Sequence, residues 1–429
     1  MPLDLTSPKL AGNGGRPVRT KRWLDNFTFG EEDKRAAVAA IESGYLSKFE
    51  GSHTPDPPFS FRGGPYVQRF EAMWSEYYGV KFSVSVNSAT SGLFAALGAL
   101  GVGFGDEVIV SPSTMTACAV GPLLYGAIPI FGDVERKTGA LDPASLQKVI
   151  TPRTKVIIVV HQYGIPADMD PIMAIARAHG LKVIEDCAQS HAAKYRGRFV
   201  GTIGDIGVFS LNVNKSIQCG EGGVCTTADE NLKYRLELIR NHGEAVVGPA
   251  GYTDITNILG FNFRMTEILA AIAIEQLKKL DEINRVRIGY VEYLNDRIAD
   301  YEFLETMLGR ERCVSTFYTW PLIFRPEVAG VDVESFRRAL NQEGMYFIRG
   351  YKPLYLQPLY QTKTLFKHGY PWSAAENRDI RTNYEAGSCP IAEEMRERIL
   401  VNEYIRLPNT QGDLDDILTA IAKVAGATQ

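Results

Sequence analysis

Three segments of this chain combine residue types that can hold and activate a ligand. The first, VIEDCAQSHA at 183–192, places Glu185 and Asp186 directly after an apolar run typical of a buried strand. In an α/β sheet, residues just past the carboxyl end of a strand face the ligand crevice. A carboxylate there can keep a pyridinium nitrogen protonated, bind a metal ion or hold a ribose. The alternative is an acid on a solvated loop.

The second segment, GTIGDIGVFSLNVNKSIQCGEGG at 201–223, holds a single lysine, Lys215, between a strand-like IGVFSL and a glycine-rich turn. A lysine near apolar walls has a lowered pKa and becomes a competent Schiff-base amine. Glycines allow the backbone to approach a ligand closely. The alternative is a surface lysine before a turn, but the flanking pattern favours the chemical role.

The third segment, NSATSGLFAALGAL at 87–100, opens a helix with small hydroxyl residues, among them Ser88 and Thr90. A helix N-terminus offers unpaired N–H groups and the positive end of the helix dipole, which together suit a phosphate. An ordinary helix cap is at least as common an explanation of this pattern.

The composition sets the class of protein. Of the 429 residues, 45% are hydrophobic and 22% are charged, and the formal net charge is -4. We therefore expect a globular chain of two or more domains, with neither nucleic acid nor a membrane as partner. The six cysteines form no CxxC pair and the six histidines show no paired-ligand spacing, so we expect reduced thiols in the cytoplasm and no metal site. The N-terminus lacks the apolar region of a signal peptide, and no run of about 18 apolar residues predicts a membrane span.

Alternating strands and helices dominate from about residue 66 onward. Continuous apolar runs separated by helical segments predict a mainly parallel sheet covered by helices on both faces. The predicted strands are Ser83–Val86, Glu107–Val110, Val156–Val160 and Leu181–Glu185, and the predicted helices include Ala89–Leu100, Pro171–Ala178 and Thr266–Leu280.

The pattern changes along the chain in a way that predicts three parts. Residues 1–30 are rich in Gly, Pro and basic side chains and form an N-terminal arm. Residues 31–290 form a large α/β domain, and residues 291–429 form a smaller α+β domain with strand-like 317–324 and helices at 333–340 and 413–425. The proline-rich stretch 48–65 is predicted to be a long loop, of the kind that carries function in compact enzymes.

Taken together and in this order, the three segments resemble the aspartate-aminotransferase fold, which is fold type I of the pyridoxal-phosphate (PLP) enzymes. More narrowly, the chain resembles the DegT/DnrJ/EryC1/StrS family of sugar and aminocyclitol aminotransferases over nearly its whole length. The resemblance implies a large domain built on a seven-stranded, mainly parallel sheet. Further matching segments are GPYVQRFEAMWSEYYGV (64–80), GVGFGDEVIVSPS (101–113), QYGIPADMD (162–170), GFNFRMTEILAAIAIEQLKKLD (260–281) and PLYLQPLY (353–360).

The resemblance also implies roles for single residues. Lys215 matches the lysine that forms the internal aldimine with PLP, and Asp186 matches the carboxylate that pairs with the pyridine nitrogen. A negative partner keeps that nitrogen protonated, and the protonated ring is the electron sink of the reaction. The other implied cofactor contacts are Ser88, Ala89, Thr90 and Ser210 at the phosphate, Ala188 on one ring face, Gln189 near the ring hydroxyl and Asn262 from the partner subunit of a homodimer with shared active sites.

Some positions depart from the family's pattern. The family usually stacks an aromatic residue on the cofactor four residues after the proline of the segment SPSTMTACA, and that position is Thr116 here. Asn212 stands where relatives often have His or Gln, and Tyr355 replaces the histidine of PLHLQPxY. These differences leave the cofactor prediction intact and bear on substrate identity.

The implied reaction is a two-stage transamination. L-glutamate or L-glutamine gives its amino group to the cofactor, which becomes pyridoxamine phosphate, and a keto sugar or keto cyclitol then leaves as the amine. Lys215 acts as general base and acid. The candidate substrate contacts are Arg349, Tyr351, Lys352 and His191; solvated charges and a hydrogen-bonded structural histidine are the alternatives.

Two other functions compete with amino transfer. Relatives that act as PLP-dependent sugar dehydratases replace the lysine with histidine, so Lys215 argues against dehydration. A non-catalytic regulatory role is a further alternative. The chain shows no DNA-binding segment, and the Lys215 and Asp186 pair is intact, so we expect an enzyme.

Overall fold

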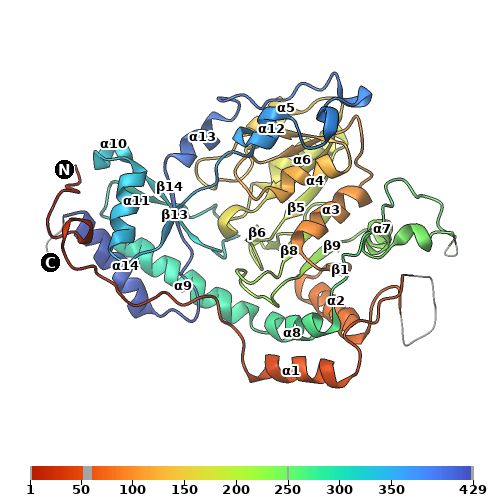
Figure 1. The fold of residues 1–429 in the computed structure, drawn as a ribbon, viewed down its shortest axis with the longest axis horizontal. Helices are drawn as coiled ribbons and strands as arrows, with labels where there is room; N and C mark the ends of the chain where they lie inside the picture. Colours follow the sequence, from red (N-terminus) through yellow and green to blue (C-terminus); the bar gives the residue numbers. More distant parts are fainter. Residues whose placement is uncertain (1, 52–59, 249–250, 427–429) are drawn as a thin grey trace.

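The computed structural model describes residues 2–51, 60–248 and 251–426. Their buried apolar side chains form two separate cores. One surrounds a large sheet and the other a small sheet, and the two sheets lie in different parts of the molecule (Figure 1). Part of the predicted loop at 48–65 lies outside the described residues, but its two ends meet in a bridge between Phe49 and Ser60. None of the helices in the described ranges is both long and apolar enough to cross a membrane.

The large sheet has seven strands, as the family resemblance implied. All of them are parallel except the second in spatial order, which pairs antiparallel with both of its neighbours. In spatial order the strands are β1 (Phe82–Val86), β9 (Gly223–Thr227), β8 (Ile206–Ser210), β5 (Lys182–Asp186), β4 (Thr154–Val160), β2 (Glu107–Val110) and β3 (Ile128–Phe131).

Helices cover this sheet on both faces. Neighbouring residues of β8 point to opposite sides, because side chains alternate along a strand. Val208 lies against Gly92 of α3 (Ala89–Ala99), whereas Phe209 contacts Trp74 of α2 (Pro65–Tyr78). The predicted doubly covered α/β sheet is therefore confirmed. The other helices of this part are α1 (Glu31–Glu42), α4 (Ala117–Leu124), α5 (Pro143–Val149), α6 (Met169–His179), α7 (Glu230–Arg240) and α8 (Glu267–Leu277).

A long helix, α9 (Leu280–Ile298), joins the two cores. Its first turns place Leu280 and Ile283 in the large core, and its last turns place Leu294 and Ile298 in the small one. The small core surrounds an antiparallel sheet, flanked by α11 (Val333–Gln342) and α14 (Gln411–Val424). In spatial order its strands are β10 (Leu304–Thr306), β12 (Trp320–Phe324), β14 (Ile399–Asn402) and β13 (Phe347–Arg349).

The range 291–429 contributes to both cores. Leu354, Tyr360 and Ala392 pack into the large core, although the strands before and after them build the small sheet. This stretch carries α12 (Pro358–Thr362) and α13 (Pro390–Arg396), and a third small sheet joins β11 (Cys313–Val314) to β6 (Lys194–Tyr195) and β7 (Arg198–Phe199).

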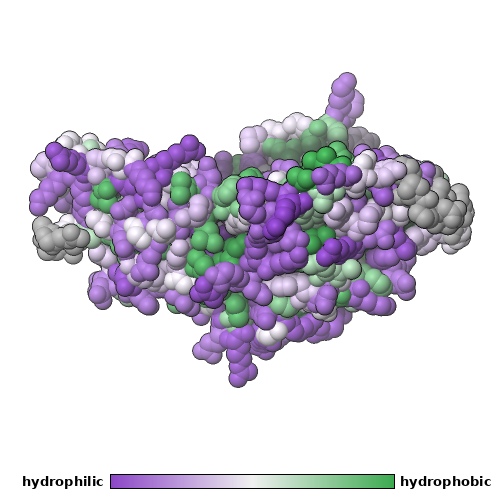
Figure 2. Space-filling view, turned by 90° about the horizontal axis from the view of Figure 1, so that it is seen from below, coloured by the Kyte–Doolittle hydropathy of each residue, from purple (hydrophilic) through white to green (hydrophobic). Residues whose placement is uncertain are grey.

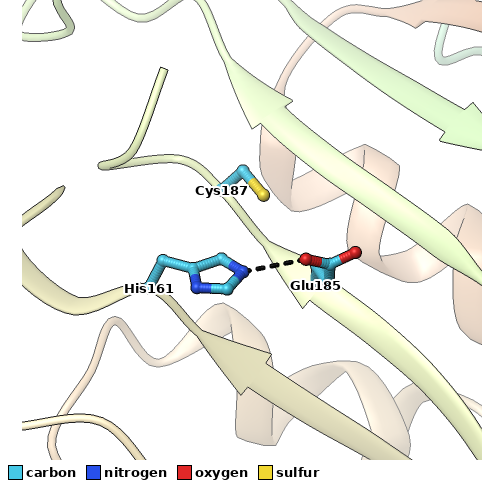
Figure 3. Close-up of side chains that lie close together, drawn as sticks. All are labelled: His161, Glu185 and Cys187. Carbon is cyan, nitrogen blue, oxygen red and sulfur yellow. Dashed lines mark hydrogen bonds and ion pairs between the residues drawn. The ribbon is translucent and has the colours of Figure 1, made fainter. Parts of the chain in front are cut away.

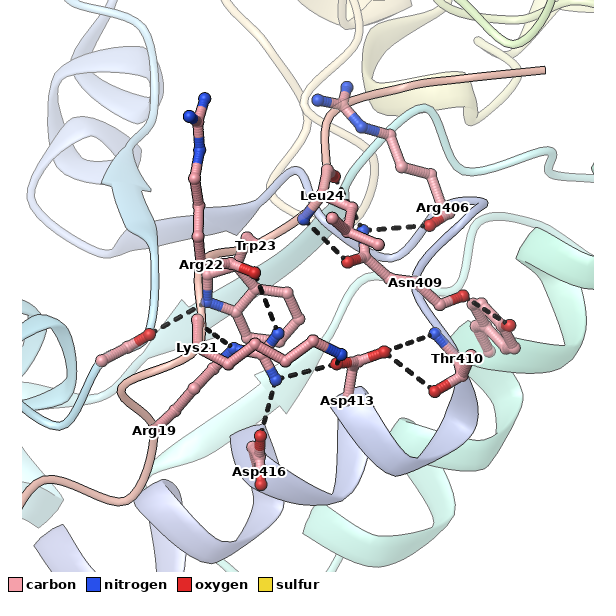
Figure 4. Close-up of polar contacts among 12 residues, drawn as sticks. Arg19, Lys21, Arg22, Trp23, Leu24, Arg406, Asn409, Thr410, Asp413 and Asp416 are labelled. Atoms are coloured by element: carbon pink, nitrogen blue, oxygen red, sulfur yellow. Dashed lines mark hydrogen bonds and ion pairs between the residues drawn. The ribbon is translucent and has the colours of Figure 1, made fainter. Parts of the chain in front are cut away.

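The N-terminal arm lies against the small core and is held there by polar contacts (Figure 4). The guanidinium of Arg19 forms ion pairs with Asp413 at 2.9 Å and Asp416 at 2.6 Å, both on α14. The indole N–H of Trp23 donates to the carbonyl of Gly344 at 2.9 Å. The arm then continues along the molecule to the loop that carries Lys215.

Candidate active site

Lys215 lies in the loop between β8 and β9, at the carboxyl end of β8. The backbone N–H of Lys215 donates to the carbonyl of Asn212 at 2.9 Å, which makes a tight turn. The side-chain amide of Asn26, at the end of the N-terminal arm, donates to the carbonyls of Val213 at 3.1 Å and Lys215 at 2.9 Å. The Lys215 amine sits 4.4 Å from the ring centroid of Tyr318. The loop and the amine are therefore both held in place.

The environment of the Lys215 amine favours its neutral form. Burial lowers the pKa of Lys215, while the negative charges of Asp186 and Glu403 oppose that effect in part. Within the described ranges no carboxylate forms an ion pair with the amine. A buried amine of lowered pKa is what nucleophilic attack on a carbonyl carbon requires.

Asp186 is the last residue of β5, and its buried carboxylate is held from both sides. One oxygen accepts the backbone N–H of Ala188 at 2.9 Å, and the other accepts the thiol of Cys118 at 3.1 Å. Burial, together with the charge of Asp186, raises the pKa of Cys118 well above its usual value, so the thiol keeps its proton and remains a donor. Each carboxylate oxygen still has a lone pair for a further cationic N–H.

The helix α3 begins beside this loop and offers an anion site. The hydroxyl of Ser88 accepts the backbone N–H of Ser91 at 3.0 Å and so caps the helix. The backbone N–H groups of Ala89 and Thr90 hydrogen bond to no described residue. The hydroxyl of Ser210, at the end of β8, accepts the N–H of Asn212 at 3.3 Å and donates to no group in the described parts of the chain, so its proton is free to donate. Free N–H and O–H donors at a helix N-terminus suit a phosphate.

Gln189 links two tyrosines near Asp186. Its side-chain oxygen accepts the backbone N–H of Tyr163 at 2.7 Å, and its amide donates to the hydroxyl of Tyr351 at 3.2 Å. Ala188, one residue earlier, is half-buried and presents only a methyl group. The structure thus brings Tyr351, which the sequence singled out for the substrate, next to a predicted cofactor contact.

A pocket of about 290 Å³ adjoins these residues, between the large sheet and β13 and β14 of the small one. Its walls carry several hydroxyl groups, one carboxylate and one guanidinium. The lining residues are Tyr163, Gln189, Tyr318, Thr319, Ile348, Arg349, Gly350, Tyr351, Val401 and Glu403. Because Tyr318 in its lining lies beside the Lys215 amine, this pocket is the candidate site for the substrate.

The other predicted substrate contacts lie in three different settings. Arg349 lines the pocket, but its guanidinium forms an ion pair with Glu397 at 2.6 Å. Lys352 is exposed and does not line the pocket. His191 is buried between Trp74 and Phe209, and neither of its ring nitrogens hydrogen bonds to a described residue. The structure therefore favours a structural role for His191 through aromatic packing.

His191 is also held neutral. Burial and the nearby charge of Lys215 lower its pKa to about 3. The ring therefore carries no charge at neutral pH and adds none to the site.

Thr116 and Asn262 both present exposed side chains. Thr116 begins α4, and the neighbouring apolar side chain of Met115 is 57% exposed. The backbone carbonyl of Asn262 accepts the side-chain amide of Asn87 at 3.3 Å, directly before the start of α3. The side-chain oxygen of Asn262 accepts from Arg264 at 2.8 Å. Asn262 thus lies near the anion site of its own chain.

Tyr355, one of the departures from the family pattern, has a packing role. It is buried in the large core, and its hydroxyl contacts the carboxylate of Glu393 and accepts the backbone N–H of Cys389 at 3.2 Å. These contacts attach the segment before α12 to the start of α13.

His161, Glu185 and Cys187 form a buried cluster beside the site (Figure 3). The ring of His161 accepts the backbone N–H of Ala167 at 3.1 Å through Nδ1, so Nε2 carries the proton and donates to Glu185 at 3.0 Å. Both ring nitrogens are therefore engaged within the protein, which leaves no lone pair for a metal ion.

The carboxylate of Glu185 is an anchor for the loop that precedes β8. It accepts backbone N–H groups from Gly201 at 2.8 Å, Ile203 at 2.7 Å and Gly204 at 2.6 Å. Burial alone raises the pKa of Glu185, but the hydrogen bonds from His161 and from these N–H groups outweigh it and lower the pKa. The acidic pair forms the last two residues of β5, where Glu185 positions the backbone and Asp186 faces the ligand side.

Four residues around Lys215 and Asp186 were not anticipated from the sequence. Arg287 of α9 is buried and donates to the hydroxyl of Ser216 at 3.3 Å, and burial lowers its pKa to about 10. The others are Cys118, Tyr318 and Glu403. They come from separate elements with no shared spacing, and only folding brings them together.

The comparisons with known proteins agree with this geometry. Residues 59–399 match the DegT/DnrJ/EryC1/StrS aminotransferase family. The L-glutamine:2-deoxy-scyllo-inosose aminotransferase of Streptoalloteichus tenebrarius is 32% identical, with 97% of each chain covered. The L-glutamine:scyllo-inosose aminotransferase of Streptomyces griseus is 33% identical, over 84% of this chain and 86% of that one.

Solved structures show the same fold. An aminotransferase from Psychrobacter cryohalolentis superposes with a TM-score of 0.78 at 27% identity, covering 94% of this chain and 99% of that one. DesV of S. venezuelae gives a TM-score of 0.76 at 27% identity, covering 93% and 95%. The fold is that of the PLP-dependent transferases of fold type I, and the enzyme class is aminotransferase. The chain belongs to the DegT/DnrJ/EryC1/StrS aminotransferase family.

Proposed function

We propose that this enzyme moves an amino group from L-glutamine, or L-glutamate, to a keto cyclitol, with PLP held covalently on Lys215. The observation that carries the proposal is the half-buried Lys215, whose amine has no ion-pair partner among the described residues and lies within the electrostatic reach of Asp186. A keto sugar is the second candidate acceptor. The relatives at 32% and 33% identity are L-glutamine:2-deoxy-scyllo-inosose and L-glutamine:scyllo-inosose aminotransferases, which supports the cyclitol as acceptor and glutamine as donor.

The residues present fit PLP. Ala89, Thr90 and Ser210 would take the phosphate with their unengaged N–H and O–H groups. Asp186 would take the ring nitrogen with a lone pair that Ala188 and Cys118 leave free. When bound, PLP supplies a protonated ring that accepts the electron pair of the donor's Cα–H bond.

The chain's own groups then move the proton. Burial lowers the pKa of Lys215 and so increases the share of neutral Nζ, which is the form that can take the proton from the α-carbon of the amino donor. The ring centroid of Tyr318 lies 4.4 Å from Nζ, and this ring limits the positions that Nζ can occupy. The same amine returns the proton at the end of the half-reaction.

We also infer a homodimer. Large apolar side chains lie exposed on α1 and on the segments that flank it. The view from below, the side on which α1 lies in Figure 1, shows apolar groups among polar ones (Figure 2). Exposed apolar groups gathered on one face mark an interaction surface. The residues are Phe27 at 60%, Val38 at 50%, Ile41 at 56% and Leu46 at 51% exposure. The six free thiols fit a reducing compartment such as the cytoplasm.

The two half-reactions can be tested separately by absorbance. L-glutamine added to the PLP-loaded enzyme should convert its absorbance to that of pyridoxamine phosphate, and a keto cyclitol such as 2-deoxy-scyllo-inosose should restore it. No change with either glutamine or glutamate would contradict amino transfer. A deoxygenated product formed without a new amine would point to dehydration.

A further inference from the structure

The pocket beside Lys215 contains one carboxylate without a partner. Glu403 follows β14 and lines the pocket, and its charge acts on both Lys215 and Tyr318. No hydrogen bond or ion pair joins the Glu403 carboxylate to another residue in the described parts of the chain. Because no contact within the described protein uses this carboxylate, and because it lies in a pocket next to a reactive amine, it is available to a ligand.

Residues that carry hydroxyl groups line the same pocket as this carboxylate. Thr319 is only 2% exposed, and its hydroxyl oxygen is buried without any hydrogen-bond partner in the described structure. A buried polar atom without a partner is costly, so a ligand that satisfies it gains affinity. The hydroxyls of Tyr318 and Tyr351 also line the pocket, and the Tyr351 hydroxyl is already tied to Gln189.

Among the lining residues the one cation is Arg349, whose charge is already balanced by a carboxylate, although its buried Nε has no hydrogen-bond partner in the described structure. The guanidinium of Arg349 is bound to the carboxylate of Glu397 at 2.6 Å and to the carbonyl of Arg396. A phosphorylated or diphosphate-linked ligand would therefore meet an unpaired negative charge and a neutralised positive one. The volume of about 290 Å³ lies at the lower end of the range of small-ligand sites, about 300 to 1,000 Å³, which suits a single ring.

We propose that Glu403 and Thr319 bind ring hydroxyls of the amino acceptor, and that the acceptor is an unphosphorylated polyhydroxy ring ketone. A carboxylate forms short, strong hydrogen bonds to hydroxyl donors and can accept two neighbouring hydroxyls at once. Thr319 completes the set with one hydroxyl that both donates and accepts. This inference rests on the proposed aminotransferase function and selects the cyclitol over a nucleotide-linked sugar.

Binding of an unreactive ring polyol tests this assignment without turnover. The PLP-loaded wild-type enzyme is titrated with scyllo-inositol by calorimetry and compared with Glu403→Gln. We expect Glu403→Gln to weaken binding about tenfold or more, because a charge-assisted hydrogen bond is lost. Thr319→Val, which keeps the shape of the side chain, should weaken it by a smaller factor.

Glu305→Gln is the matched control. Glu305 is an exposed carboxylate on β10 outside this pocket, so the same change of charge there should leave polyol binding unaltered. If Glu403→Gln loses the cofactor absorbance, which would indicate a folding defect, Glu403→Asp and Thr319→Val decide the question.

Two results would overturn the inference. One is unchanged scyllo-inositol binding in Glu403→Gln and Thr319→Val. The other is a wild-type enzyme that binds a nucleoside diphosphate more tightly than the polyol, or aminates a nucleotide-linked keto sugar faster than a keto cyclitol. Either result can occur in an enzyme that still reacts with glutamine, so it is distinguishable from failure of the proposed function.

Discussion

Asp186 and its two donors show how the protein prepares a charge for a ligand. Ala188 and Cys118 fix the two oxygens of the carboxylate, and neither donor carries a charge. The negative charge is therefore oriented but not neutralised. A cationic ring nitrogen would supply the missing partner.

Replacing this charge gives the first prediction. Asp186→Asn keeps the size of the side chain but cannot hold a ring nitrogen protonated. PLP should still attach to Lys215, while the glutamine half-reaction should slow by about 100-fold or more, a loss comparable to that of a general acid or base. Stopped-flow absorbance measures the rate. A half-reaction at the wild-type rate would remove Asp186 from its proposed role.

His191 gives a prediction about pH. Its folded pKa is about 3, against an ordinary value of 6.5. Between these values the unfolded chain binds a proton that the folded protein excludes, so the free energy of unfolding falls as the pH is lowered below 6.5. The slope from this one group is at most about 1.4 kcal/mol per pH unit.

His191→Phe removes that titration and retains the aromatic packing with Trp74 and Phe209. Urea unfolding at about pH 7 and about pH 5 should show a smaller loss of stability in the variant than in the wild type. An equal loss in both proteins would show that His191 does not titrate as its burial predicts.

At the scale of elements, Glu185 ties the end of β5 to the loop before β8 and to His161. Glu185→Gln keeps the shape but turns an N–H donor toward backbone N–H groups that need acceptors. We expect a loss of about 2 to 3 kcal/mol in the free energy of unfolding near neutral pH. Chemical denaturation measures it, and Glu305→Gln controls for the change in charge.

The sign of the pH dependence follows from the lowered pKa of Glu185. Its stabilisation is present above the ordinary value of 4.5 and is lost as the pH falls through the lower folded value. The difference in the free energy of unfolding between wild type and Glu185→Gln should therefore become smaller at acidic pH. A difference that stays constant down to low pH would contradict the charged state assigned here.

Elements with a continuous apolar pattern were predictable from the sequence. The strand Glu107–Val110 is confirmed residue for residue, and α3 begins at Ala89 as the pattern indicates. The strand β9 was not predicted, because its antiparallel pairing with β1 and β8 depends on contacts distant in sequence. The place of Glu403 in the site could not be predicted for a similar reason, since nothing near it in the sequence indicates that it lies close to the loop that carries Lys215.

At the scale of the whole molecule, the site depends on how the parts of the chain meet. The N-terminal arm reaches the Lys215 loop through Asn26, and the small sheet supplies Glu403 to the pocket. Asn262 lies near the start of α3 within the same chain, while the family pattern assigns its role to a partner subunit. The two arrangements predict different behaviour in mixed dimers.

Complementation between inactive variants distinguishes them. If Asn262 serves the partner's site, mixing Lys215→Ala with Asn262→Ala creates one wild-type site in each mixed dimer, and about a quarter of all sites should regain activity. The subunits are mixed under conditions that allow exchange, and dimers are verified by light scattering. No recovery after exchange would place Asn262 in the site of its own chain.

The most direct test of the central claim concerns Lys215 itself. PLP-loaded enzyme is reduced with borohydride, digested and mapped by mass spectrometry. The proposed function predicts one reduced pyridoxyl adduct, on the peptide that contains Lys215, and its loss in Lys215→Ala. An adduct on another lysine, or none in a folded protein saturated with PLP, would contradict the assignment of this enzyme's chemistry to Lys215.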